Sequence, residues 1–242
     1  MFKKLLWITL FCAATGWLSS PDAYGQANVD PNQVFESYVQ AIGGQPALAA
    51  IQDRTVNGTV SVFGMSGTLA WQEKVPNKTH QVYDFGMAKV ETWFDGNQGY
   101  RIDPNRGDGP YAAEEIEEAK DNYVIFPLLA YKERSLKLRY VKTDKVGDRE
   151  VDVVEATDPK GTVITYSFDK STHYLVQTVV PVPASRGGGS MEIGFSDYRD
   201  VKGVKFPFKI VNTTSAMTLE IGFDSIEVNT GLADTVFQHS SP

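Results

Sequence analysis

Two stretches of the sequence decide the fold: MEIGFSDYRDVKGVKFPFKI, from Met191 to Ile210, and LEIGFDSIEV, from Leu219 to Val228. Both begin with large apolar residues that alternate with polar or small ones, a two-residue period that predicts β-strands with one apolar face. We expect them to be neighbouring strands near the end of one bent sheet, with the apolar face toward a concavity and the polar face toward water. Because proline donates no hydrogen bond to a ladder, Pro207 predicts an edge or a bulge in its strand.

The two-residue period extends over most of the chain that follows Arg54. Turn signals recur at short intervals, as at Pro76-Asn77, Asp95-Gly96-Asn97 and Lys202-Gly203, and this spacing predicts about eleven strands. No linker rich in proline or serine divides them, and a chain of 242 residues that is 42% hydrophobic can bury a substantial core. The sequence therefore predicts a mainly β (α+β) fold with a single antiparallel sheet, which must curl to cover its apolar face.

Residues 31–51 interrupt this pattern and are predicted to be helical. Asp30 can cap the first helix, with Pro31 at its first position. Gly43-Gly44 should end that helix, and Pro46 can start a short second one. These helices are available to cover one face of the sheet.

A second interruption runs from Tyr111 to Lys132, with the sequence YAAEEIEEAKDNYVIFPLLAYK. It begins as an acidic helix and ends in an apolar run, and Pro127 should bend or end the helix. One interpretation is a lid over the concave face of the sheet. The other is a crossover helix that simply packs there.

The first 25 residues have the pattern of a signal peptide. Lys3 and Lys4 precede an apolar segment that is too short for a comfortable membrane span. Ala23 to Gly25 fits a small-x-small cleavage pattern, so we expect cleavage near Gly25, a periplasmic protein and a single domain at residues 26–242. The alternative is an uncleaved membrane anchor.

Removal of residues 1–25 would take away two lysines, one aspartate and Cys12, the only cysteine of the chain. The net charge would change from −7 to −8. An acidic balance argues against nucleic acid as a partner. Without cysteine, the remaining chain has no disulfide and no thiolate metal site.

The sequence contains no complete motif for catalysis or metal binding. His80, His173 and His239 are far apart and lack ligand spacing. GMSGT, at Gly64 to Thr68, lacks the glycine spacing of a nucleophile elbow, and RGGGSMEIG lacks the final lysine of a P-loop. A calcium loop over Asp103 to Glu114 would have its glycine out of register. We therefore predict no enzyme activity, no metal and no cofactor.

Apolar side chains crowd the first five predicted strands and the end of the acidic segment. One sheet with two or three helices has more inward apolar residues than the helices easily cover, which favours an apolar ligand cavity. The alternative for each residue is a place in an ordinary core. The candidate cavity residues are Phe63, Met65, Leu69, Trp71, Phe85, Met87, Trp93, Phe94, Phe126, Leu128, Leu129, Ile193, Phe195, Ile221 and Phe223.

Five segments carry a family resemblance: YVQAIGGQPALAAI, GYRIDP, PLLAYKE, YSFDKSTHYLV and FSDYRDVKGVKFPFKI. In this order the chain resembles outer-membrane lipoprotein-sorting proteins of the LolA/LolB-like superfamily, from about Pro31 to Phe237. The resemblance implies an unclosed half-barrel, in which a strongly bent antiparallel sheet has helices covering its concave face. It also implies a buried arginine that holds a lid. Arg54 and Arg101 are the candidates, and the alternative for both is a surface charge on a hairpin.

The resemblance implies a periplasmic carrier that binds lipid or lipoprotein acyl chains in an apolar cavity and moves them toward the outer membrane. Membrane-bound donor and acceptor proteins would then be further partners. The alternative is a non-enzymatic binding or sensing module with a protein partner. Lipid that purifies with the protein would favour the carrier, and a stable protein complex with an empty cavity would favour the module.

Overall fold

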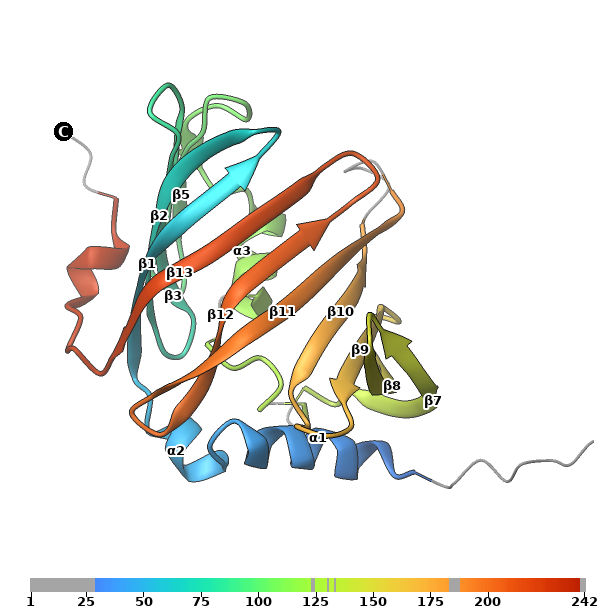
Figure 1. Cartoon of the computed structure of the whole chain (residues 1–242). Helices are drawn as coiled ribbons and strands as arrows, with labels where there is room; N and C mark the ends of the chain where they lie inside the picture. Colours follow the sequence, from blue (N-terminus) through green and yellow to red (C-terminus); the bar gives the residue numbers. More distant parts are fainter. Residues whose placement is uncertain (1–28, 123–124, 130, 133, 183–187, 240–242) are drawn as a thin grey trace, which may run out of the picture.

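One antiparallel sheet dominates the structure (Figure 1). The computed structural model describes residues 29–122, 125–129, 131–132, 134–182 and 188–239, so the expected signal peptide and its cleavage site lie outside the described residues. The strands are β1 (Asp53–Val62), β2 (Met65–Lys74), β3 (Lys78–Asp84), β4 (Lys89–Phe94), β5 (Gly99–Ile102), β6 (Gly109–Pro110), β7 (Lys137–Val146), β8 (Arg149–Thr157), β9 (Val163–Asp169), β10 (Leu175–Pro181), β11 (Ser190–Val201), β12 (Val204–Thr213) and β13 (Thr218–Val228).

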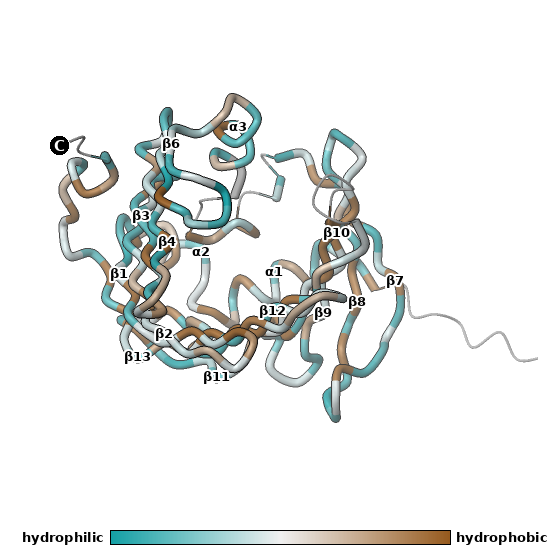
Figure 2. The backbone as a smooth tube through the Cα atoms, turned by 90° about the horizontal axis from the view of Figure 1, so that it is seen from above, coloured by the Kyte–Doolittle hydropathy of each residue, from teal (hydrophilic) through white to brown (hydrophobic). Residues whose placement is uncertain are grey.

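The strand order is β6-β5-β4-β3-β2-β1-β13-β12-β11-β10-β9-β8-β7, and in the described residues β6 and β7 end the sheet without pairing to each other. The sheet is therefore open, and Figure 2 shows it curved around the helices as a half-barrel. This confirms the predicted fold class. The described part has thirteen strands instead of about eleven, because strands as short as β5 and β6 contain too few residues to show an alternating pattern.

Local irregularities help to bend the sheet. The β1–β13 register shifts at Asn57 and Gly58, and further shifts occur in the β9–β10 and β7–β8 ladders. A Cβ atom added to Gly58 would lie 2.1 Å from the carbonyl oxygen of Gly222, so only glycine allows this close approach of the two strands. Such bulges increase the local twist and let a large sheet curl.

The two ribbons that decide the fold are β11 and β13, and they lie on either side of β12. The prediction that they are direct neighbours near the end of the sheet was therefore wrong, since they occupy its middle. Phe195 pairs with Ile210, which pairs with Ile221, so the apolar residues of the three strands share one face. The strand β12 is not a sheet edge. Its ladder with β13 covers Lys209 to Thr213 and does not reach Pro207. Pro207 therefore lies where no donor to β13 is needed.

The helices are α1 (Pro31–Ala41), α2 (Gln45–Ala49), α3 (Ala113–Asn122) and the short 3₁₀ helix η2 (Asp234–Phe237). Asp30 caps α1 by accepting a hydrogen bond from the Asn32 N–H, as its sequence predicts. The helices α1 and α2 lie inside the curve of the sheet (Figure 2). We call the sheet face that they cover the concave face. Within the described ranges, none of the helices combines the length and the apolar character that crossing a membrane would need.

Two clusters of buried side chains lie on the concave face. The first cluster centres on Phe206, Phe208, Ile221 and Phe223 and includes Leu48 of α2. The second cluster, on β8 to β10, surrounds Phe35 of α1. The ring of Phe35 lies 5.2 Å from that of Phe168 and 5.5 Å from that of Tyr166, measured between centroids. Burial raises the pKa of Tyr166 to about 12, so this phenol stays neutral.

Asp53, at the start of β1, ties the segment after β13 to the sheet. Its carboxylate accepts backbone hydrogen bonds from Thr230 (2.7 Å), Gly231 (2.9 Å) and Leu232 (3.3 Å). Burial alone would raise the pKa of Asp53, but these hydrogen bonds outweigh it and lower the pKa below its ordinary value.

Replacing Asp53 with asparagine should lower the free energy of unfolding at neutral pH by about 1.5–3 kcal/mol, because an amide accepts these N–H groups less well than a carboxylate. A depressed folded-state pKa means that the carboxylate stabilises the fold above the unfolded-state pKa of about 3.9 and loses this effect as the pH falls. Urea unfolding of both proteins should therefore converge in acid. Asp224→Asn, at an exposed position of β13, is the control and should change little. An equal loss in both variants would contradict the role of Asp53.

Candidate functional site

The concave face of β1, β2, β12 and β13 is a continuous apolar surface. The β1–β2 register places Trp71 opposite Val56 and Leu69 opposite Gly58, and the β1–β13 register places Phe223 opposite Gly58 on the other side. The rings of Trp71 and Phe223 lie 5.2 Å apart in an edge-to-face arrangement. This surface has the chemistry that accepts an apolar ligand.

A short segment, described at residues 125–129 and 131, lies on this surface. Ile125 is buried in the first cluster, whereas Leu128 and Tyr131 are buried in the second, so the segment bridges the two. Phe126 is only partly buried, and its ring lies 5.5 Å from that of Phe206. Between these residues, the N–H of Leu129 donates to the carbonyl of Phe126 and closes a turn.

The same face becomes polar on β3 to β5. The Thr79 and Thr92 hydroxyls and the Arg101 Nε are buried there without a hydrogen-bond partner among the described residues. The Arg101 guanidinium donates two hydrogen bonds, of 2.9 and 2.8 Å, to Glu115 of α3. Buried polar atoms without partners are rare in proteins. The concave face therefore combines an apolar zone with a smaller polar zone.

Glu115 links α3 to the edge of the sheet. It accepts hydrogen bonds from the Ala112 N–H (2.8 Å) and from Arg101, and it contacts Arg106. Burial opposes its ionisation, but the hydrogen bonds and the two arginines lower the pKa of Glu115 below its ordinary value. One guanidinium nitrogen of Arg101 contacts both carboxylate oxygens of Glu115, so a charge-assisted contact ties α3 to β5.

Arg54 and Glu73 form an ion pair on the concave side of β1 and β2. The Arg54 Nε donates to the Glu73 carboxylate at 2.6 Å, and the two side chains are 13% and 12% exposed. The guanidinium carbon lies 5.5 Å from the centre of the Phe206 ring, within the range of a cation–π contact. Both candidate arginines are therefore largely buried and paired, and the alternative of a surface hairpin charge is wrong for both.

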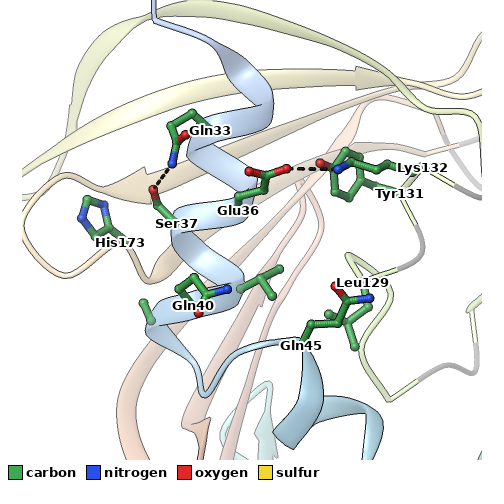
Figure 3. Close-up of a pocket in the computed structure, with 11 residues that line it drawn as sticks. Gln33, Glu36, Ser37, Gln40, Gln45, Leu129, Tyr131, Lys132 and His173 are labelled. Carbon is green, nitrogen blue, oxygen red and sulfur yellow. Dashed lines mark hydrogen bonds and ion pairs between the residues drawn. The ribbon is translucent and has the colours of Figure 1, made fainter.

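A groove of about 600 Å³ runs between α1 and the side chains of Leu129, Tyr131 and Lys132 (Figure 3). Lys132 and Glu36 form an ion pair of 3.0 Å across it, and both side chains are exposed. Polar residues such as Gln33 and Gln40 line one side, while Leu129 contributes an apolar side chain that also packs against the first cluster. The groove therefore leads from solvent to the margin of the bridging segment.

The structure gathers most of the predicted cavity residues on the concave face. Leu69, Ile221, Phe223, Leu128 and Phe94 are buried there. A further group is partly buried on the same face, namely Trp71, Phe85, Phe126, Leu129, Ile193 and Phe195.

The other predicted residues lie elsewhere. Trp93 points away from the concave face, because its neighbour Phe94 occupies that face, and its ring stacks on His80 at 5.0 Å and contacts His239. Phe63, Met65 and Met87 are exposed at hairpin tips. Phe63, Met87 and Trp93 therefore lie away from the concave face, whereas Met65 has the same alternation as Leu69 and Trp71 and lies at the exposed end of that face.

Sequence reasoning missed Phe206 and Phe208 as members of the site. Both have the two-residue spacing of the other concave-face residues, and the proline between them drew attention to the ladder instead. It also missed the second cluster around Phe35, which needs the contact between α1 and β8 to β10.

Solved structures of low sequence identity share this fold. A DUF1329 family protein from Desulfovibrio piger ATCC 29098 has a TM-score of 0.59 and 12% identity, over 87% of this chain and 98% of that one. A putative outer membrane lipoprotein-sorting protein domain from Vibrio parahaemolyticus has a TM-score of 0.57 and 12% identity, over 86% and 97%. A LolA superfamily protein from Nitrosomonas europaea has a TM-score of 0.55 and 10% identity, over 87% and 98%. No family model and no curated protein sequence matches the chain.

Replacing Arg54 with methionine should lower the free energy of unfolding by roughly 3–5 kcal/mol, because it leaves Glu73 buried without its partner. The double variant Arg54→Met/Glu73→Leu should recover most of this loss, since it removes both charges. Urea unfolding of the two single variants and the double variant measures the coupling.

The control is the exposed pair Arg139–Glu155, where Arg139 is 65% exposed. Arg139→Met should cost less than about 1 kcal/mol. If Arg54→Met costs no more than this control, Arg54 and Glu73 do not form a buried pair in solution.

Proposed function

We propose that this chain, which has the LolA/LolB-like fold, is a periplasmic carrier that binds lipid or lipoprotein acyl chains on the concave face of its sheet and moves them toward the outer membrane. One observation carries the proposal. The apolar concave face is covered by a bridging segment, residues 125–129 and 131, whose described backbone hydrogen bonds are all local. Such a cover can leave the face without breaking a strand ladder.

Apolar transfer supplies the binding energy in this proposal. An acyl chain that replaces the bridging segment exchanges water for contact with residues such as Trp71, Phe206 and Phe223. Burial of each CH₂ group contributes about 0.8 kcal/mol, so a chain of about a dozen methylenes binds usefully even after its ordering cost. The bridging segment must move for this, because a ligand of that size cannot enter a filled core.

The polar zone suits the other end of an amphiphile. Thr79, Thr92 and Arg101 offer buried donors and acceptors on the same face as the apolar zone. A lipid with its polar group there and its acyl chain along Leu69 and Trp71 would satisfy both zones at once. We infer carriage and not catalysis, because this arrangement binds an amphiphile by complementary surfaces.

The first test identifies the ligand that purifies with the protein. Protein purified from its native periplasm is extracted with organic solvent, and the extract is analysed by mass spectrometry. Lipid or acylated peptide at a fixed ratio to protein supports the carrier. An empty protein in a stable complex with another protein would favour the binding or sensing module.

The two tryptophans that follow the expected signal peptide report on where an acyl chain binds. Trp71 lies on the concave face and Trp93 on the opposite one. A fatty acid brominated on its chain should quench the fluorescence of Trp93→Phe, which retains Trp71. It should leave Trp71→Phe, which retains Trp93, nearly unchanged, because a bromine atom quenches only at contact distance.

The two variants are matched controls for each other. Equal quenching in both would place the acyl chain away from the concave face. Absence of quenching in both would argue against acyl binding and in favour of the protein-binding module.

Phe126→Asp tests the bridging segment as a movable cover. A carboxylate facing Phe206 should weaken the segment's contact with the apolar zone, so the affinity for a fluorescent acyl probe should change by about tenfold or more. Val163→Asp, at an exposed position of β9, is the control and should bind the probe like the parent. With folding checked by thermal melts, a folded Phe126→Asp protein with parental affinity would show that the segment is not the cover.

A further inference from the structure

Three hairpin tips expose large apolar side chains to solvent. Phe63 and Met65, at the β1–β2 turn, are 70% and 43% exposed. Met87, at the β3–β4 turn, is 88% exposed, and Met217, at the β12–β13 turn, is 40% exposed. We call these four residues the hairpin rim. Exposed apolar groups gathered in one region mark interaction sites in soluble proteins.

The three tips lie at the same end of the sheet. Val62 pairs with Leu219, so the β1–β2 turn lies beside the β12–β13 turn. Thr68 pairs with Asp84, which places the β3–β4 turn next to the start of β2. The helices α1 and α2 lie at the opposite end, where the Lys205 N–H donates to the carbonyl of Ile42 (Figure 1).

The backbone at Phe63 indicates that its side chain serves something other than folding. Phe63 has φ of 51° and is followed by Gly64 with φ of 76°. A turn with two left-handed residues favours asparagine or aspartate followed by glycine, and a bulky residue there is a backbone outlier. Phe63 nevertheless occupies the position while remaining largely exposed, so packing against the described residues does not compensate for it.

The sequence uses the same three residues, Phe-Gly-Met, at two of the tips: Phe63 to Met65 and Phe85 to Met87. In the second tip Phe85 turns inward and packs against the first cluster, whereas Met87 points outward. Each tip therefore presents at least one large apolar side chain to solvent.

The scarcity of charged side chains around the hairpin rim indicates which kind of partner it binds. Residues 61–66 and 213–218 contain no charged side chain, and the third tip is flanked by one of each sign, Asp84 and Lys89, in a chain of net charge −7. A surface with no net charge and with single apolar residues on separate projecting turns complements a fluid, electrically neutral interface better than a pre-shaped protein surface.

We propose that the hairpin rim inserts into the surface of a lipid bilayer with zwitterionic headgroups. Phe63 and the three methionines enter the boundary between headgroups and acyl chains, and the serine, threonine and glycine residues of the turns remain among the headgroups. The contact is reversible, because a few apolar side chains contribute far less than a membrane span. It is independent of what the concave face carries.

Flotation of the full chain with phosphatidylcholine vesicles tests the proposal. The parent protein should float with the vesicles, and raised salt should not release it, because the attraction is apolar. Phe63→Asn/Met87→Ser should reduce vesicle binding by about tenfold or more, the amount expected for two lost apolar anchors. Because asparagine suits the left-handed position, this variant should melt no lower than the parent.

Val163→Ser is the matched control, since it removes an exposed apolar side chain of β9, four strands from β13 in the sheet. It should float like the parent. The proposal is overturned if the parent does not float, if the rim variant floats equally well, or if the rim variant abolishes self-association of the chain without affecting flotation. It is also overturned if the rim variant loses quenching of Trp71 by the brominated fatty acid, because the rim would then belong to the acyl site.

Discussion

The structure depends on one constraint: a long antiparallel sheet that does not close must cover its apolar concave face with elements other than strands. A closed barrel of similar strands can fill its interior with its own side chains. Here the cover comes from α1, α2 and the bridging segment, and it joins two separate clusters, one around Phe206 and one around Phe35. The bridging segment belongs to no helix or strand, Phe126 is only partly buried, and the described backbone hydrogen bonds of the segment stay local. Regions of this kind open at lower free energy than the ladders they cover.

Much of the fold follows from the sequence, because a two-residue period fixes which residues share a strand face. Ile221 and Phe223 were placed correctly on this ground alone. The same rule cannot choose between adjacent aromatic residues. Trp93 and Phe94 necessarily point to opposite faces, and only the pairing of Phe94 with Thr79 decides which of them is inward. The position of β11 and β13 in the middle of the sheet was equally out of reach, since it depends on the pairing of β1 with β13, which are more than a hundred residues apart.

The polar residues of the site were harder to predict than the apolar ones. Arg54 and Glu73 are separated by a hairpin, and each alone has the composition of a surface charge. Their burial becomes visible only when the register places them on the face that also carries Val56 and Trp71. A buried pair of this kind is not a strong source of stability, because desolvation offsets the Coulomb attraction. It does define where the apolar zone ends, and the unpaired atoms of Thr79, Thr92 and Arg101 continue the polar zone beyond it.

The two ends of the half-barrel have opposite chemistry, and this asymmetry connects the fold to the proposed function. At the end with α1, the groove is lined by polar side chains and crossed by the exposed ion pair of Lys132 and Glu36. At the other end, the hairpin rim is uncharged and exposes Phe63 and Met87. Strands of an antiparallel sheet place alternate turns at each end, so a single curved sheet can present a water-facing end and a membrane-facing end without a second domain. Insertion of the rim would leave α1, and the groove beside it, at the end of the sheet that points away from the bilayer.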